Sequence, residues 1–231
     1  MKKTLRIALI AAAASLMMTA TSCNKFNGND ERIFTALVTM ESSESGVVLQ
    51  LNDSTVLRTP DIDPKKYGNK TSRALINFSI NEDQPSTKAI ETYNVKVYAI
   101  DTIRTKLPVA DLGENNDKEY GKDKIDIVRD WVNIGEDGYL TLRIRTARGS
   151  DAKKIHYVNL VDLGYADGKY NYELRHNADG DLGFMYADGL MAFDLNSLRP
   201  ADGKPVMLNI KWESYEGDER DADVKLTFRK R

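Results

Sequence analysis

The stretch YLTLRIRT, residues 139–146, alternates apolar and polar side chains without a break. Leu140, Leu142 and Ile144 fall on one side of an extended chain, and a threonine and two arginines fall on the other. A spacing of two is typical of a strand in an antiparallel sheet that buries one face. The stretch therefore predicts a half-buried β-strand and a β-rich fold around it.

Short runs of the same kind continue towards the C-terminus. In the last one, residues 223–229, Val224, Leu226 and Phe228 alternate with polar residues. Glycine and aspartate turns separate the runs, which is the pattern of a β-sandwich. We therefore expect a β-sandwich domain over residues 125–230, whose other strands lie at 155–162, 170–177, 190–195 and 206–215.

The N-terminal half predicts a second all-β domain over residues 33–110. Within residues 93–103 the alternation places Tyr93, Val95, Val97 and Ala99 on the inward face. Because the strands are short and no long helix is evident, they indicate a small OB-like barrel or an open sheet. The remaining strands are expected at residues 34–41, 47–51, 55–58 and 74–80.

Residues 111–124 have almost no apolar content, so we expect the domain boundary there. The alternative is a long surface loop inside a single domain.

The first 22 residues have the features of a bacterial lipoprotein signal peptide. Lys2, Lys3 and Arg6 form a basic head, and residues 7–18 form an apolar run that is too short for a permanent membrane span. Small residues then lead into Cys23, the only cysteine of the chain. We predict cleavage before Cys23 and lipidation of its thiol, because two or more acyl chains give stable membrane attachment. An ordinary secretory signal followed by a chance cysteine is the alternative.

Residues 23–32 are polar and predict a flexible tether between the lipid and the folded body. The expected location is the cell envelope, lipid-anchored in the outer membrane on its periplasmic face or at the cell surface. The membrane is then a partner through the lipid on Cys23.

The charge balance argues against nucleic acid as a partner. The whole chain has 33 basic and 35 acidic residues, and the signal peptide removes three basic residues and no acidic one. The remaining body is mildly acidic, whereas nucleic-acid binding requires a basic surface.

A set of segments spread over the chain carries a family resemblance. The segments are the lipid cysteine, FTALVT at 34–39, LNDSTVL at 51–57, RALINFSI at 73–80, GYLTLRI at 138–144, ELRHN at 173–177 and FDL at 193–195. In this order they resemble the NigD-like lipoprotein family of Bacteroides-type bacteria. The resemblance implies an N-terminal OB-like domain and a C-terminal β-sandwich, and it implies no catalytic residues. A departure at Ser54, where the family more often has glycine, concerns the turn type of a hairpin.

No constellation in the sequence points to catalysis, a metal or a cofactor. We interpret His156 and His176 as structural residues, because partner ligands at metal-site spacing are missing. Residues 177–181 with Asp188 resemble a calcium loop, but Leu182 occupies the glycine position, so a solvated turn is the better interpretation. The acidic segment 216–221 is interpreted as a soluble loop tip.

The aromatic residues divide into expected core and expected surface. Trp131 and Trp212 lie in predicted strands and are expected in the core. An exposed aromatic surface is expected from Tyr165, Tyr170, Tyr172 and Tyr186, which lie near Gly and Asp turns.

These observations lead to three functional hypotheses. The first is a non-enzymatic envelope lipoprotein that acts as a binding or accessory protein. The second is a glycan-binding lipoprotein of a polysaccharide-uptake system, and the third is a hydrolase with dispersed carboxylates.

Overall fold

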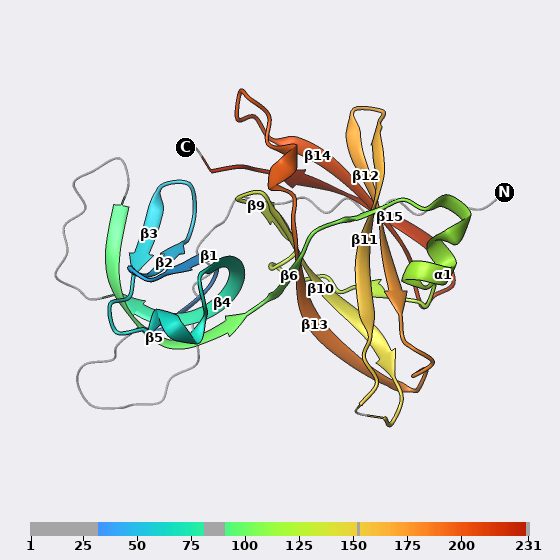
Figure 1. Cartoon of the computed structure of the whole chain (residues 1–231), viewed down its shortest axis with the longest axis horizontal. Coiled ribbons are helices and arrows are strands. Elements are labelled where there is room, and N and C mark those ends of the chain that lie inside the picture. The colour runs from blue at the N-terminus through green and yellow to red at the C-terminus, as the bar shows by residue number, and fades with distance from the viewer. Residues whose placement is uncertain (1–31, 81–90, 152, 230–231) are drawn as a thin grey trace. The chain divides into compact units, whose positions relative to one another are not determined.

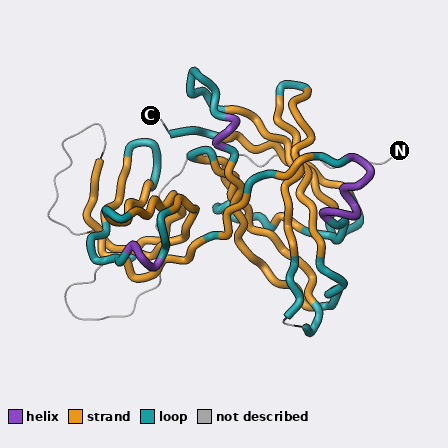
Figure 2. The backbone as a smooth tube through the Cα atoms, viewed as in Figure 1, coloured by secondary structure: helices purple, strands orange, loops and turns teal. Residues whose placement is uncertain are grey.

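The structure is a computed structural model that describes residues 32–80, 91–151 and 153–229, and these divide into two compact units at residue 104/105. Strands dominate both units, with one short α-helix and brief 3-10 turns between them (Figures 1 and 2). The prediction of an all-β chain is therefore confirmed.

The first unit is a closed barrel of five strands in the order β1-β2-β3-β5-β4. Neighbouring strands pair antiparallel except β3 and β5, which pair parallel. This is the OB-like barrel that the sequence predicted. Its strands are β1 (Phe34–Ser43), β2 (Gly46–Gln50), β3 (Thr55–Arg58), β4 (Lys70–Ile80) and β5 (Glu91–Thr102), and a 3-10 turn covers Pro64–Lys66.

The LNDST segment forms the tight turn between β2 and β3. The side chain of Asn52 accepts a hydrogen bond from the Ser54 amide at 3.0 Å, and the Leu51 amide donates to the Thr55 carbonyl at 3.0 Å. Asparagine thus closes this turn through its side chain, without a glycine at position 54.

One expectation for the barrel is wrong. Val95 is buried in the core, but Ala99 is exposed and Ile100 packs inward in its place. The pairing of β4 with β5 shifts between Asn77 and Phe78, where Asn77 lies opposite Ala99 and Phe78 lies opposite Val97. This bulge adds a residue to β5, and the inward side of the strand changes parity there.

The second unit is a ten-stranded curled sheet, the β-sandwich domain. Its order is β6-β13-β10-β9-β15-β14-β12-β11-β7, and β8 pairs with β10. The strands are β6 (Arg104–Lys106), β7 (Val109–Ala110), β8 (Asp126–Ile127), β9 (Ile134–Glu136), β10 (Tyr139–Arg148), β11 (Tyr157–Ala166), β12 (Lys169–Asn177), β13 (Met185–Asp194), β14 (Val206–Glu213) and β15 (Glu219–Leu226).

The inward faces of these strands form one apolar core. Leu140, Leu142 and Ile144 of β10 lie in it, as the alternation in residues 139–146 predicted. They pack with Trp212 of β14 and Phe193 of β13, which are also buried.

The segment 111–124, which the sequence marked as the domain boundary, lies inside the second unit. It follows β6 and β7 and contains a 3-10 turn (Gly113–Asn115) and the helix α1 (Asn116–Tyr120). The structure therefore begins its second sheet earlier than the sequence suggested. The low apolar content of residues 111–124 reflects their exposure at the surface of this domain. The sequence did not show that the second sheet starts before them, because β6 and β7 are too short to give a recognisable pattern.

Candidate functional site

An exposed apolar loop at one end of the β-sandwich domain is the candidate site. We call residues 178–186, which comprise the connection from β12 to β13 and the first two residues of β13, the apolar loop. Leu182, Phe184, Met185 and Tyr186 are 65%, 101%, 62% and 59% exposed. Large apolar side chains gathered this closely on a surface mark interaction sites more often than isolated ones do.

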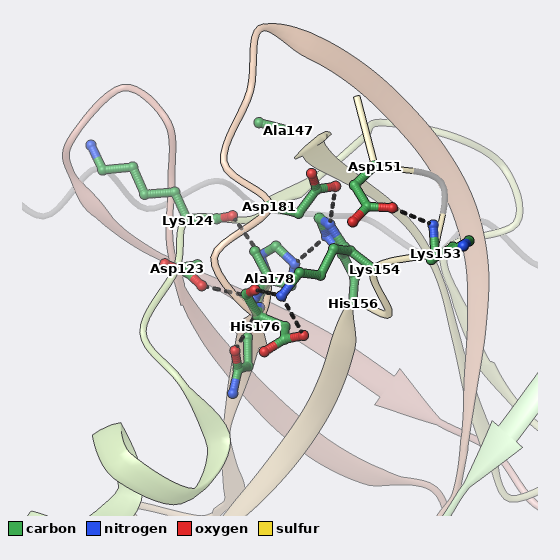
Figure 3. Close-up of polar contacts among 12 residues, drawn as sticks. Asp123, Lys124, Ala147, Asp151, Lys153, Lys154, His156, His176, Ala178 and Asp181 are labelled. Atoms are coloured by element: carbon green, nitrogen blue, oxygen red, sulfur yellow. Dashed lines mark hydrogen bonds and ion pairs between the residues drawn. The ribbon is translucent and has the colours of Figure 1, made fainter. Parts of the chain in front are cut away.

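A chain of buried hydrogen bonds lies beneath the apolar loop (Figure 3). Nδ1 of His176 lies 3.0 Å from the Lys124 carbonyl oxygen, and Nε2 of the same ring lies 2.9 Å from Nδ1 of His156. Nε2 of His156 then lies 3.2 Å from a carboxylate oxygen of Asp181. We call these three side chains the His-His-Asp chain. It links the segment before β8, the end of β12 and the apolar loop.

The His-His-Asp chain is shielded from water. His176 is fully buried, and the side chains of His156 and Asp181 are only 4% and 8% exposed. Burial, with a smaller contribution from the neighbouring His156 ring, lowers the pKa of His176, although the hydrogen bond to Lys124 acts in the opposite direction. His176 is therefore held neutral.

Asp181 is held in its ionised form. Burial opposes ionisation, but hydrogen bonds from His156 and from the amides of Gly149 and Asp151 outweigh it and lower the pKa of Asp181 below the usual carboxyl value. A buried carboxylate requires such donors.

Backbone contacts fix the apolar loop against the loop that follows β10. The Gly149 amide donates to the Asp181 carbonyl at 3.2 Å, and the Asp181 amide donates to the Ala178 carbonyl at 2.9 Å. A Cβ atom at Gly149 would overlap the Asp181 carboxylate, and one at Gly183 would overlap the Arg148 carbonyl. Glycine is needed at both positions because the two loops approach so closely.

Two side-chain contacts hold the start of the apolar loop. The Ala178 amide donates to the Asp123 carboxylate at 2.8 Å, and Lys154 donates to the Asp179 carbonyl and carboxylate at 2.8 and 3.0 Å. The base of the loop is thus fixed, while its apolar side chains face solvent.

The structure brings some of the predicted residues together and separates others. His156 and His176 lie in direct contact, and both have structural partners. Asp188 lies on β13 and pairs with Arg143 and Arg145, whereas Asp181 belongs to the His-His-Asp chain. The carboxylates of the calcium-like segment therefore do not point toward a common site. Among the described residues, no group of three or more His, Cys, Asp or Glu side chains is arranged to hold a metal ion.

The aromatic expectations are confirmed in part. Trp212 is buried, but Trp131 lies in a turn before β9 and is 50% exposed, so its placement in the core is wrong. Tyr172 is buried as well, whereas Tyr165 and Tyr186 are exposed. Successive side chains of a strand point to opposite faces of the sheet, and Tyr172 of β12 points to the core side.

The apolar loop itself was not recognised in the sequence. The run DLGFMY at 181–186 holds four large apolar or aromatic residues among glycines and aspartates, and this was the available signal. The neighbouring carboxylates resemble those of a calcium loop, so the sequence interpretation concerned a metal site and not an apolar surface.

Cys23, the predicted lipidation site, lies outside the described residues, as do the signal peptide and most of the predicted tether. Among the residues that the structure describes, no helix has the length and apolar composition needed to cross a membrane.

Several solved structures share the fold. A putative toxin-related protein from Parabacteroides distasonis is 31% identical over 84% of this chain and 93% of its own, with a TM-score of 0.69. A NigD-like immunity protein from Bacteroides caccae is 17% identical over 86% and 93%, with a TM-score of 0.59. A putative lipoprotein from Bacteroides fragilis is 12% identical over 85% and 98%, with a TM-score of 0.57.

The comparison with curated proteins gives no match. The family model of the NigD-like C-terminal beta sandwich domain matches residues 108–226, which cover the curled sheet from β7 to β15. The chain therefore belongs to the NigD-like family.

Proposed function

We propose that this chain is a non-catalytic lipoprotein of the bacterial cell envelope that binds a protein partner, or serves it as an accessory subunit, through the apolar loop. The observation that carries the proposal is the exposure of Leu182, Phe184, Met185 and Tyr186 above a buried and fully hydrogen-bonded base. A contact surface that is already ordered loses little conformational entropy on binding.

The chemistry of the apolar loop fits a protein surface. Aromatic side chains and methionine are enriched in protein interfaces, and a few buried aromatic residues supply most of the binding free energy. Phe184 is fully exposed and has Met185 and Tyr186 beside it, so it is the expected central contact.

Two observations support the lipoprotein part of the proposal. The sequence places Cys23 directly after a basic and apolar leader, and a similar fold occurs in a protein named as a putative lipoprotein. Attachment through Cys23 to the outer membrane would keep the binding domain close to partners in the envelope.

Photo-crosslinking in living cells tests the binding role. We expect a photoreactive phenylalanine analogue at position 184 to give one discrete adduct with a protein, identified by mass spectrometry. The matched control places the analogue at Tyr165, which is 64% exposed on the β11–β12 hairpin and should give none. The same adducts from both positions, or none from position 184, would contradict the proposal.

A glycan ligand is the second candidate. Tyr165 is exposed and stacks edge-on against Tyr170, with ring centroids 4.8 Å apart, and such a pair can contact a sugar ring. Glycan-array binding that is lost in a Tyr165→Ala variant and kept in a Phe184→Ala variant would favour this candidate over the first.

A further inference from the structure

The hydrogen bonds of the His-His-Asp chain determine how many protons the two histidines carry. The carbonyl of Lys124 at one end and the carboxylate of Asp181 at the other can only accept. Each of the three contacts needs one proton, so three protons must lie on the four ring nitrogens of His156 and His176. Two neutral rings carry two protons, and the pair therefore holds one extra proton and one positive charge.

The other charge states leave a contact broken. If both rings are neutral, two lone pairs face each other at one of the three contacts. If both rings are charged, the N–H groups of His156 and His176 point at each other across 2.9 Å. Only the singly charged pair satisfies every contact, and because the rings interact directly, the proton belongs to the pair.

The surroundings place the positive charge on His156. Its ring touches the Asp181 carboxylate, whereas His176 is fully buried and faces Arg148, which disfavours a charge there. The other charged groups that face the pair are Asp123 from the segment before β8, Asp151 and Lys154 from the loop after β10, and Asp179 of the apolar loop, which is neutralised by Lys154.

We propose that the His156–His176 pair carries a single positive charge, centred on His156, that holds the apolar loop through Asp181, so that loss of this proton releases the loop. When the proton leaves, the remaining N–H of His156 stays on Nε2, where it donates to the Asp181 carboxylate. Lone pairs on Nδ1 of His156 and Nε2 of His176 then face each other. Both rings are buried, and water cannot take the place of the missing donor. The apolar loop, still bound to His156 through Asp181, therefore loses its hydrogen bond to His176 of β12.

This device makes binding depend on the proton activity at the cell envelope. This pH dependence of binding rests on the proposed function, since the apolar loop is taken as the contact surface for the partner. The charge state and the order of the loop are measured on the isolated protein, so they can succeed or fail independently of the crosslinking result.

Nitrogen NMR of the histidine rings tests the charge. The sample is the full chain carrying Cys23→Ser, recorded from about pH 5.5 to about pH 8.5, the range across which histidine side chains change charge. At the acidic end of this range we expect both nitrogens of His156 to be protonated and His176 to be protonated at Nδ1 alone. Two neutral rings at every pH would overturn the proposal.

Amide hydrogen exchange tests the release of the loop. The amides of Gly149 and Asp181 are followed relative to Gly217, whose amide donates to Ser214 far from the histidines in sequence. The reference amide cancels the pH dependence of the chemical exchange step. Once the pair has lost its proton, we expect the two loop amides to exchange about tenfold faster.

The variant Asp181→Asn separates charge from contact. Its carboxamide keeps one acceptor oxygen and can donate to Nε2 of a neutral His156, so all contacts are satisfied without the extra proton. We expect its loop exchange to change less than about twofold across the same pH range. Lys204→Gln, which removes the exposed Lys204–Asp202 ion pair and leaves every contact of the His-His-Asp chain in place, should keep the wild-type pH response.

A pH response in Asp181→Asn as large as in the wild type would overturn the proposal. If that variant does not fold, the wild-type measurement still decides, because constant loop exchange while the ring spectra show loss of the proton excludes the release.

Discussion

Arg229 and Asp137 form a two-pronged ion pair between the C-terminal end of the described chain and the turn that joins β9 to β10. Nη2 lies 2.7 Å from one carboxylate oxygen and Nε lies 2.9 Å from the other. The side chains are 24% and 11% exposed. The pair therefore ties the segment just after β15 to a turn 92 positions earlier in the chain.

Replacing Arg229 by alanine should destabilise the β-sandwich domain by about 1–3 kcal/mol, because the Asp137 carboxylate loses its bidentate partner in a mostly buried position. Urea unfolding followed by tryptophan fluorescence measures this, since both tryptophans of the chain, Trp131 and Trp212, lie in that domain. The matched control is Lys204→Ala, whose pair with Asp202 is largely exposed and should contribute under about 1 kcal/mol. Equal losses in both variants would refute the expectation.

Gly183→Ala should destabilise the domain by about 1–3 kcal/mol, because the added methyl group meets the backbone of Arg148 and Gly149. Gly189→Ala on the neighbouring β13 is the control: a Cβ there meets no atom within 4 Å, so the change should be within about 0.5 kcal/mol. Urea midpoints of the two variants give the comparison. A stable Gly183→Ala variant would show that the two loops can separate without loss.

The stability of the β-sandwich domain should fall on acidification. His176 has a pKa below that of an unfolded histidine, about 6.5, so the unfolded chain binds more protons as the pH drops through that value. Stability from this residue is thus complete above about pH 6.5 and decreases below it. Asp181 acts in the same direction at lower pH, because its lowered pKa means that stability is lost as the pH falls through the folded value.

Urea unfolding at a series of pH values measures this slope, and His176→Gln should reduce it. A slope that is unchanged in this variant would show that another group is responsible.

Cys23→Ser should release the protein from the membrane fraction, because the acyl chains on this thiol are the proposed attachment to the membrane. Labelling with radioactive palmitate should mark the wild type and leave the variant unmarked. Ser22→Ala, which keeps the cysteine, is the control and should remain labelled. Labelling that persists without the thiol would remove the lipid attachment from the proposed function.

The fold was largely predictable because strands with one buried face repeat every second residue. Leu140, Leu142 and Ile144 show this repeat and lie in the core. The repeat failed at Ala99, because a bulge is set by the partner strand and leaves no mark in the local sequence. It also gave no signal for β6 and β7, which are too short to show a period.

The candidate site was less predictable. His156 and His176 are 20 positions apart, and only the pairing of β11 with β12 brings them together, with Val158 opposite His176. The role of Asp181 depends on the loop after β10, which lies about thirty residues earlier in the chain. Sequence could therefore suggest structural histidines, but it could not assemble the contact between them.

The position of β6 and β7 governs how the chain can be divided for separate study. These short strands pair with β13 and β11, at the two ends of the curled sheet. A fragment cut within residues 111–124 would leave both of those strands with bare backbone edges, which invite pairing between molecules and aggregation. A fragment intended to fold as the isolated sandwich must therefore start no later than Arg104.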